Sequence, residues 1–224
     1  MNKLTKILVL LVCGAIVTTT LSSCEEEEDN KVAKAQKCLN DLTDASSDAE
    51  AQACMDKISG IESTGAYTIR CSATFFMGGL TTSKIVDAFK LHSDAAANEK
   101  EAVLIENLSL SSTAEANAAY DFCEKTGIPG LLKIAALVQI GTMVSSQAGG
   151  DISAQIDACI ANPGTNPGEC DLTSIASSAL VLADSYCKGE SVDEQICKDI
   201  ASAEASAGGD LQVLAQLLLN QIKP

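Results

Sequence analysis

The stretch Ile128–Ser145, IPGLLKIAALVQIGTMVS, decides the fold of this chain. Its apolar residues occur nearly all round a helix instead of along one stripe, which is typical of a helix enclosed by other helices. Gly127 ends the segment before it, and Pro129 suits the first turn of a new helix. Because Lys133 and Gln139 interrupt the stretch and its length is marginal for a bilayer, we expect a central buried helix rather than a transmembrane one.

On both sides of this segment, helical patterns alternate with turn residues. Helices are predicted over residues 31–43, 48–59, 65–80, 81–97 and 99–110, from Ser112 to Gly127, over a short segment ending near Cys159, from Asp171 to Tyr186, from Ser191 through Cys197, and over 211–222. Aromatic residues make up only 3% of the chain, and small Ala and Ser residues are abundant, which favours closely packed helices over a sheet. We therefore predict an all-α fold, either an irregular disulfide-braced helical bundle or a helical-hairpin array.

Local signals refine this prediction. Three pairs of residues have the spacing of a capping box: Ser47 with Glu50, Ser112 with Glu115, and Ser191 with Glu194. Segment 81–97 carries an apolar stripe at helical spacing, made of Ile85, Val86, Phe89 and His92. We expect this stripe to face the core. The pair Gly78-Gly79 should either end a helix or let another backbone approach closely.

The N-terminus has the layout of an export signal. Lys3 and Lys6 precede an apolar run from Ile7 to Val17, and Leu21-Ser22-Ser23-Cys24 follows a short polar stretch. A leucine and two small residues before a cysteine resemble the lipobox of bacterial lipoproteins. The resemblance covers residues 1–24 only, and it implies that Cys24 is the lipidated residue, with Leu21, Ser22 and Ser23 as processing determinants. Several acyl chains would then hold the protein stably on a membrane.

This layout divides the chain into three parts. Residues 1–23 are expected to be a removable signal peptide, and residues 24–30 the lipidated cysteine with an acidic tether, because Glu25-Glu26-Glu27-Glu28-Asp29 repels itself and stays solvated. The acidic run resembles sorting signals of some surface-displayed lipoproteins, or it is a spacer from the headgroups. Residues 31–224 form the helical domain, with two possible halves, 31–148 and 149–224.

Eight cysteines remain in the mature chain besides Cys24, and an even number in an exported protein indicates disulfides. Cys38 and Cys54 each lie eight residues from Ser46, so a helical hairpin would place them side by side. The other expected pairs are Cys71–Cys123, Cys159–Cys170 and Cys187–Cys197, although eight cysteines allow about a hundred pairings. Zinc is the competing explanation, but the chain has no C-x-x-C and a single histidine.

The charge of the chain limits its partners. The sequence has 15 basic and 30 acidic residues. Lys3 and Lys6 are lost with the signal peptide, which leaves 13 basic and 30 acidic residues and a net charge of −17. Such a chain should not bind nucleic acid, and it should avoid anionic membrane except through its lipid. No basic cluster is evident along the sequence.

No pattern of catalytic residues is evident. His92 is the only histidine, and the chain lacks G-x-S-x-G, S-x-x-K, H-E-x-x-H, a phosphate-binding glycine loop and a calcium loop. Paired acids such as Asp193 and Glu194 lie near expected helix starts, where they favour the helix dipole. We expect neither an enzyme nor a resident cofactor or metal.

The first hypothesis is therefore a non-enzymatic lipoprotein of the bacterial cell envelope, anchored through Cys24, with the outer membrane favoured over the inner. It would act as a helical interaction or structural module with a protein partner. The alternative is binding of a small hydrophobic ligand or lipid, as a transport accessory. The apolar segment 128–145 and the small residues at Gly78-Gly79 could frame a cavity for such a ligand, whereas a tightly filled core would exclude it.

Overall fold

The computed structural model describes most of the chain after the acidic run begins, namely residues 27–96, 99–147, 151–165, 169–185, 187–188 and 195–223. These residues form eleven helices, and their only β-type pairing is a bridge between Pro163 and Cys170. The predicted all-α fold is confirmed. The lipobox residues Leu21, Ser22, Ser23 and Cys24 and the third capping box, Ser191 with Glu194, lie outside the described residues.

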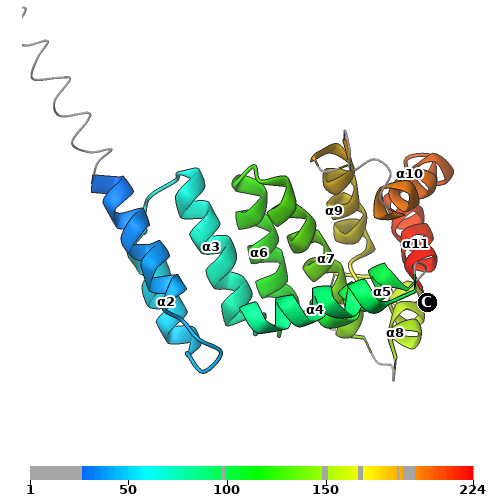
Figure 1. Cartoon of the computed structure of the whole chain (residues 1–224). Helices are drawn as coiled ribbons and strands as arrows, with labels where there is room; N and C mark the ends of the chain where they lie inside the picture. Colours follow the sequence, from blue (N-terminus) through cyan, green and yellow to red (C-terminus); the bar gives the residue numbers. More distant parts are fainter. Residues whose placement is uncertain are drawn as a thin grey trace, which may run out of the picture.

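The helices follow one another with short connections. They are residues 27–40, α2 (Asp48–Asp56), α3 (Thr64–Met77), α4 (Thr82–Asp94), α5 (Lys100–Asn107), α6 (Thr113–Lys125), α7 (Pro129–Ser145), α8 (Ile152–Ala161), α9 (Leu172–Ser185), α10 (Gln195–Ala207) and α11 (Leu211–Ile222). Figure 1 shows most of them standing side by side in a row, in which α2, α3, α6, α7, α9 and α11 are successive neighbours. Helices α4, α5 and α8 pack across this row, because α5 and α8 lie against α7 and α4 lies against α5.

Helix α7 is the centre of the main core, as its composition predicts. Eleven of its 17 residues are buried, and they include the unbroken run from Ala135 to Val144. Gly141 permits the closest contact in this core, since a Cβ there would lie 2.5 Å from the Ile105 carbonyl oxygen and 3.0 Å from that of Leu108. The end of α5 therefore rests directly on the backbone of α7.

The four predicted disulfides are all present. The Cα–Cα distance is 5.5 Å for Cys38–Cys54, 5.0 Å for Cys71–Cys123, 5.0 Å for Cys159–Cys170 and 5.4 Å for Cys187–Cys197. Each bridge joins cysteines on the same side of position 149. The main core nevertheless continues across that position, because α7 packs against α8 and α9, and one buried cluster extends from Cys71 to Ile222.

Of the two predicted capping boxes within the described residues, one is confirmed and one is not. The Ser47–Glu50 capping box is complete, since each residue accepts a hydrogen bond from the backbone amide of the other. At α6, Ser112 caps the Glu115 amide, but the Glu115 carboxylate accepts from the hydroxyls of Ser111 and Ser112 instead of from a backbone amide. That pair is a simple cap rather than the predicted capping box.

The first helix differs from the prediction at both ends. It is already helical at Glu27, where the described residues begin, and it ends at residue 40 instead of 43. Glu27, Glu28 and Asp29 thus form an exposed helical turn, in which the Glu27 carboxylate lies 2.8 Å from the Lys31 ammonium. The pair of Glu27 and Lys31, four residues apart on the helix, offsets part of the mutual repulsion of the acids.

The prediction that the α4 stripe faces the core is correct for Ile85, which packs against the main core, and wrong for Val86 and Phe89. Only Ala88 of α4 is buried, while Val86 and Phe89 are 59% and 39% exposed. Ile85 and His92 are half-buried. The helix rests on α5 at one edge of the row, so a large part of its apolar surface has no described neighbour to cover it.

Candidate functional site

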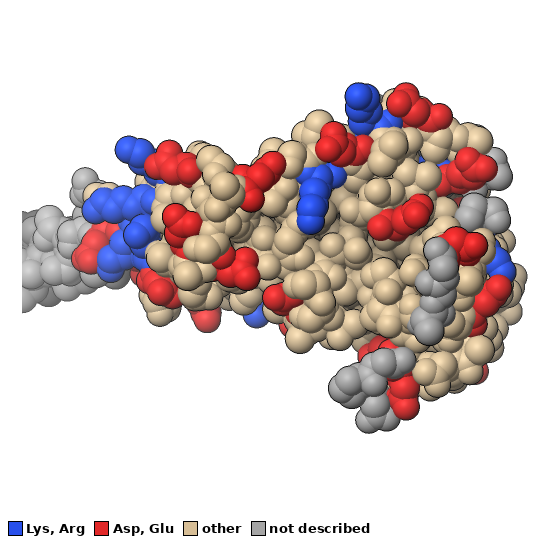
Figure 2. All heavy atoms as spheres, turned by 90° about the horizontal axis from the view of Figure 1, so that it is seen from below, with Lys and Arg blue, Asp and Glu red and all other residues tan. Residues whose placement is uncertain are grey.

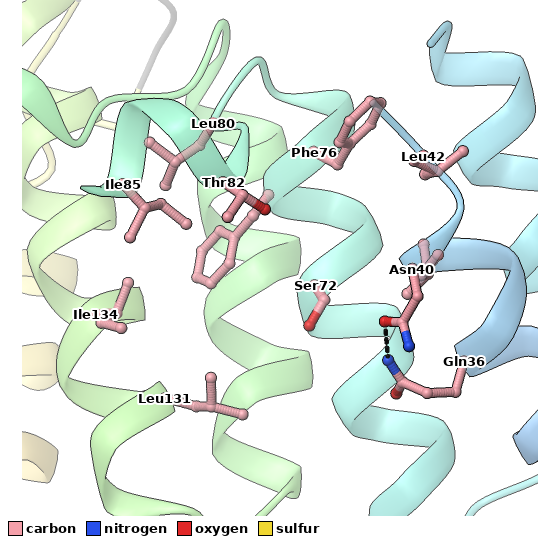
Figure 3. Close-up of a pocket in the computed structure, with 12 residues that line it drawn as sticks. Gln36, Asn40, Leu42, Ser72, Phe76, Leu80, Thr82, Ile85, Leu131 and Ile134 are labelled. Carbon is pink, nitrogen blue, oxygen red and sulfur yellow. Dashed lines mark hydrogen bonds between the residues drawn. The ribbon is translucent and has the colours of Figure 1, made fainter. Parts of the chain in front are cut away.

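An apolar groove lies between the N-terminal hairpin and the body of the molecule. Its volume is about 270 Å³, and it is drawn in Figure 3. The lining residues come from the first helix, the loop that follows it, α3, α4 and α7: Gln36, Leu39, Asn40, Leu42, Ser72, Phe75, Phe76, Leu80, Thr82, Ile85, Leu131 and Ile134. None of these side chains is titratable, so the groove has the chemistry of a binding surface and not of an acid–base site.

The groove exists because the protein has two cores. The hairpin formed by the first helix and α2 packs on α3 through a small cluster of its own: Ala35, Ile58, Ile61, Ala66 and Ile69. Further along α3, Phe75 belongs to the main core. The hairpin and the body thus diverge from α3, and their facing side chains do not fill the space between them.

The walls are built from half-buried apolar side chains. Leu131 and Ile134 lie three residues apart on the first turns of α7, and Ile85 extends from α4 towards them in Figure 3. All three pack against the edge of the main core. A ligand in the groove would therefore remove further apolar surface from water, which contributes about 25 cal/mol for each Å².

Polar groups border the groove on the hairpin side. The Gln36 side-chain amide donates to Asn40 at 3.0 Å, and the hydroxyls of Ser72 and Thr82 lie on the opposite rim. Beside the groove, the Ser83 hydroxyl donates to the Asp44 carboxylate at 2.5 Å, which joins the start of α4 to the loop after the first helix. This hydrogen bond spans 39 residues of sequence, and it ties the hairpin to α4.

The apolar surface continues outside the groove along α4. Of the five large hydrophobic residues that are exposed in the described part of the chain, three lie on this helix: Val86, Phe89 and Leu91. Phe89 meets the edge of His92, with 6.4 Å between ring centroids. Val86 and Phe89 are three residues apart and share a face of the helix, whereas Leu91, two residues after Phe89, lies on nearly the opposite side. We call the groove together with Val86 and Phe89 the α4 surface. A second, shallower depression on the α5 side of Leu91 is lined by Asp94, Glu99 and Glu106 among others.

The main core contains one polar cluster away from the groove. The Gln139 side chain donates to Asn117 at 2.8 Å and accepts from the Ser178 hydroxyl. Tyr120 is 8% exposed, and its hydroxyl makes no hydrogen bond of acceptable geometry, although Ser178 lies close enough to oppose the shift of its pKa. Burial, reinforced by the Glu124 carboxylate, raises the pKa of Tyr120 to about 12. The cluster fixes how α6, α7 and α9 pack.

The residues singled out in the sequence are not gathered in the groove. The eight cysteines are all in disulfides, and His92 lies on α4 outside the groove lining. Gly78 and Gly79 do not line it either, since Gly79 ends α3 with a φ of 86° and Gly78 packs under Leu110. In the sequence, Lys133 lies between Leu131 and Ile134, and this charged residue could have indicated that the start of α7 is close to the surface.

The described residues contain neither a candidate metal site nor a candidate membrane-spanning helix. No group of three His, Cys, Asp or Glu side chains there could hold a metal ion. No described helix is both long and apolar enough to cross a membrane. No family model, no curated protein and no solved structure matches the chain.

Proposed function

We propose that this protein is a lipid-anchored, non-enzymatic protein of the bacterial cell envelope that binds an apolar segment of a protein partner on the α4 surface. The observation that carries the binding role is the exposure of Val86 and Phe89 beside an uncharged apolar groove. Contiguous exposed apolar surface on a soluble domain is typical of protein interaction sites. The anchoring role rests on the lipobox at Leu21-Ser22-Ser23-Cys24.

The size of the groove favours side chains of a protein over a free small molecule. At about 270 Å³ it is slightly smaller than typical ligand pockets, which measure roughly 300–1,000 Å³. It suits two or three side chains that project from a helix or strand, while the exposed residues of α4 contact the rest of that segment. Interfaces of this kind obtain most of their affinity from a few buried anchors.

Site-specific crosslinking in intact cells tests the binding role. A photoreactive amino acid at Leu131 or Phe76, both in the groove, should capture one discrete protein, whereas the same probe at Val213 should not. Val213 is a suitable control because it is 37% exposed on α11, at the other end of the row. Equal capture at all three positions, or capture at none, would contradict the proposal.

A matched pair of substitutions tests whether the exposed apolar residues contribute. Phe89→Ser should lower groove crosslinking about tenfold, as expected for a contact worth roughly 1–2 kcal/mol, while Val213→Ser should leave it unchanged. Both residues are similarly exposed, at 39% and 37%, so neither change should unfold the protein. Loss of crosslinking in both variants would point to a general effect on folding.

The anchor is tested separately by mass spectrometry of the N-terminal peptide purified from membranes. The expected peptide begins at Cys24 and carries acyl chains, and Cys24→Ser should abolish both the modification and the cleavage. An intact signal peptide in a protein with free thiols would refute export and anchoring together.

A small hydrophobic ligand or a lipid is the second candidate for the groove. Its support is the lining itself, in which Leu39, Phe76 and Leu131 face a space without charge. Extraction of the protein purified from native membranes, followed by mass spectrometry for bound lipids, distinguishes the two candidates. A stoichiometric lipid that is lost in Leu131→Asp would favour the ligand.

A further inference from the structure

The structure gathers four lysines into one surface, which the sequence had not indicated. Lys31, Lys34, Lys37 and Lys57 line a shallow depression of about 540 Å³ at the end of the molecule formed by the first helix and α2. Figure 2 shows blue side chains gathered at that end, whereas red ones are spread over the whole visible face. The expectation that the chain has no basic cluster is thus corrected. We call these four residues the lysine surface.

Helical geometry and one disulfide assemble the lysine surface. Lys31, Lys34 and Lys37 are three residues apart, so successive side chains lie only about 60° apart around the helix. Lys57 comes from the end of α2. The Cys38–Cys54 bridge, next to Lys37 and three residues before Lys57, holds the two helices together with 5.5 Å between its Cα atoms.

Most of this positive charge is not neutralised within the molecule. Lys31 pairs with Glu27, and Asp41 also borders the depression. Lys34, Lys37 and Lys57 make no ion pair with any residue that the structure describes, in a protein with twice as many acidic as basic residues. Glu28, three positions before Lys31, adds negative charge beside that lysine, whereas Asp29, two positions before it, lies on nearly the opposite side of the helix.

We propose that the lysine surface binds the anionic headgroups of the membrane to which Cys24 is attached, and thereby sets the orientation of the protein on that membrane. This inference rests on the anchoring role proposed above. Lys31, Lys34 and Lys37 all lie within 13 residues of Cys24. A lysine close to an anionic leaflet contributes about 1 kcal/mol, and a lipid anchor keeps the lysines within the Debye length over which that attraction acts.

This orientation has a consequence for the α4 surface. The lysine surface lies at the α2 end of the row, and α4 begins beyond α3 in Figure 1. With the α2 end held on the headgroups, Val86 and Phe89 on α4 stay away from the lipid and remain accessible to a partner, while the first-helix wall of the groove lies nearer to it. The leaflet also repels the acidic residues on the rest of the molecule, which favours this orientation, while Glu27, Glu28 and Asp29 beside the lysines oppose it.

Chemical footprinting of the acylated, membrane-purified protein tests the inference. The protein is reconstituted in vesicles of phosphatidylcholine alone or with about a third phosphatidylglycerol, and each lysine is labelled with an amine-reactive acetylating reagent. Lys34, Lys37 and Lys57 should be about fivefold less reactive on the anionic vesicles, the factor that corresponds to 1 kcal/mol. Lys90, Lys188 and Lys198 should be unchanged. About 1 M salt should remove the protection, because it shortens the Debye length to about 3 Å.

A matched pair of triple variants separates local charge from total charge. In Lys34→Gln/Lys37→Gln/Lys57→Gln, the remaining Lys31 should lose its protection on anionic vesicles. In Lys84→Gln/Lys90→Gln/Lys198→Gln, which has the same net charge, Lys31 should keep it. Protection that persists in the first variant would overturn the proposal, and so would equal reactivity on both kinds of vesicle.

The failure of the proposed anchor gives a different result. If Cys24 is not acylated, the N-terminal peptide lacks acyl mass and the protein does not remain with either kind of vesicle. If the anchor is present but the lysine surface does not bind headgroups, the protein stays on both vesicles and its lysines react equally. The two outcomes are therefore distinguishable in one preparation.

Discussion

Helices α4 and α7 both carry apolar side chains, in a stripe on α4 and nearly all round α7, but the two helices have opposite places in the molecule. Helix α7 has eleven buried residues out of 17, whereas α4 has one out of 13. Helix α7 is enclosed by α5, α6, α8 and α9, while α4 rests mainly on α5. An apolar face in the sequence thus indicates that a helix can pack against another element, but it does not show that such an element is present. Whether the face is covered depends on the neighbouring helices, and no described helix covers Val86 and Phe89 of α4.

Removing the Cys71–Cys123 bridge should have the largest effect on this comparison. The bridge joins α3 to α6 and closes a loop, 52 residues in sequence separation, that contains both α4 and α5. Cys71→Ala/Cys123→Ala should lower the free energy of unfolding by about 4 kcal/mol. Cys159→Ala/Cys170→Ala, which opens a separation of only 11 residues, should cost about 3 kcal/mol. Urea unfolding measures the loss of stability in both variants. A larger loss for the Cys159–Cys170 variant would show that the long loop retains structure when the chain unfolds.

Truncation of one leucine in each helix compares them directly. Leu137 in α7 is 2% exposed and Leu91 in α4 is 49% exposed. Leu137→Ala should therefore cost about 3 kcal/mol, because it leaves a cavity, and Leu91→Ala should cost less than about 0.5 kcal/mol. Thermal unfolding of the two variants checks this. A similar loss of stability in the two variants would mean that Leu91 on α4 is buried in solution.

Two glycines of α7 test how closely its neighbours approach. Gly141→Ala would place a Cβ against the Ile105 carbonyl and should cost about 2–3 kcal/mol, since backbone must move. Gly130→Ala, at the exposed start of the same helix and with open space around it, should stabilise the protein by about 0.5 kcal/mol. If Gly141→Ala is tolerated in urea unfolding, α5 does not rest on α7 as described.

The burial of Tyr120 in the core predicts how the free energy of unfolding depends on pH. Its pKa is raised to about 12 from 10, so its neutral form stabilises the folded state fully below pH 10. This stability is lost as the pH rises through 12, and the free energy of unfolding should fall by about 2 kcal/mol over that interval. Tyr120→Phe should remove this part of the pH dependence and have little effect at neutral pH, because the hydroxyl makes no well-formed hydrogen bond with a described residue. Identical alkaline profiles would refute the assignment.

The smallest expected effect concerns the attachment of α4. Ser83→Ala removes the hydrogen bond to Asp44, which is exposed, so global stability should fall by less than about 1 kcal/mol. Amide exchange in α4 should nevertheless increase, while that of α7 stays unchanged, because opening of a peripheral helix does not require the core to unfold. If the amide exchange of α4 is unchanged in Ser83→Ala, the packing of α4 on α5 is sufficient to keep α4 in place.

Much of the fold was predictable because its signals are local. The Ser47–Glu50 capping box, the helix stop at Gly127 and Pro129 in the first turn of α7 depend on residues within one helical turn of each other. The Cys38–Cys54 bridge followed from a hairpin of adjacent helices. The prediction for the α4 stripe was wrong for Val86 and Phe89 because helical spacing identifies an apolar face but contains no information on what that face meets.

The candidate site was not predictable for the same reason. Its lining residues come from three separate stretches of sequence, 36–42, 72–85 and 131–134. Leu131 and Ile134 look like ordinary core residues of an apolar helix. Only the divergence of the hairpin from the body at α3 leaves them half-buried beside an open groove.

The sequence by itself determined the helical class, the buried position of α7, the cysteine framework and the acidic character of the chain, because propensity, periodicity and composition act through near neighbours. The tertiary structure decided which apolar helix stays exposed, where the groove lies and how Lys57 joins the lysines of the first helix. These features depend on packing and charge between segments that are distant in the chain, and each is set by the whole arrangement of helices.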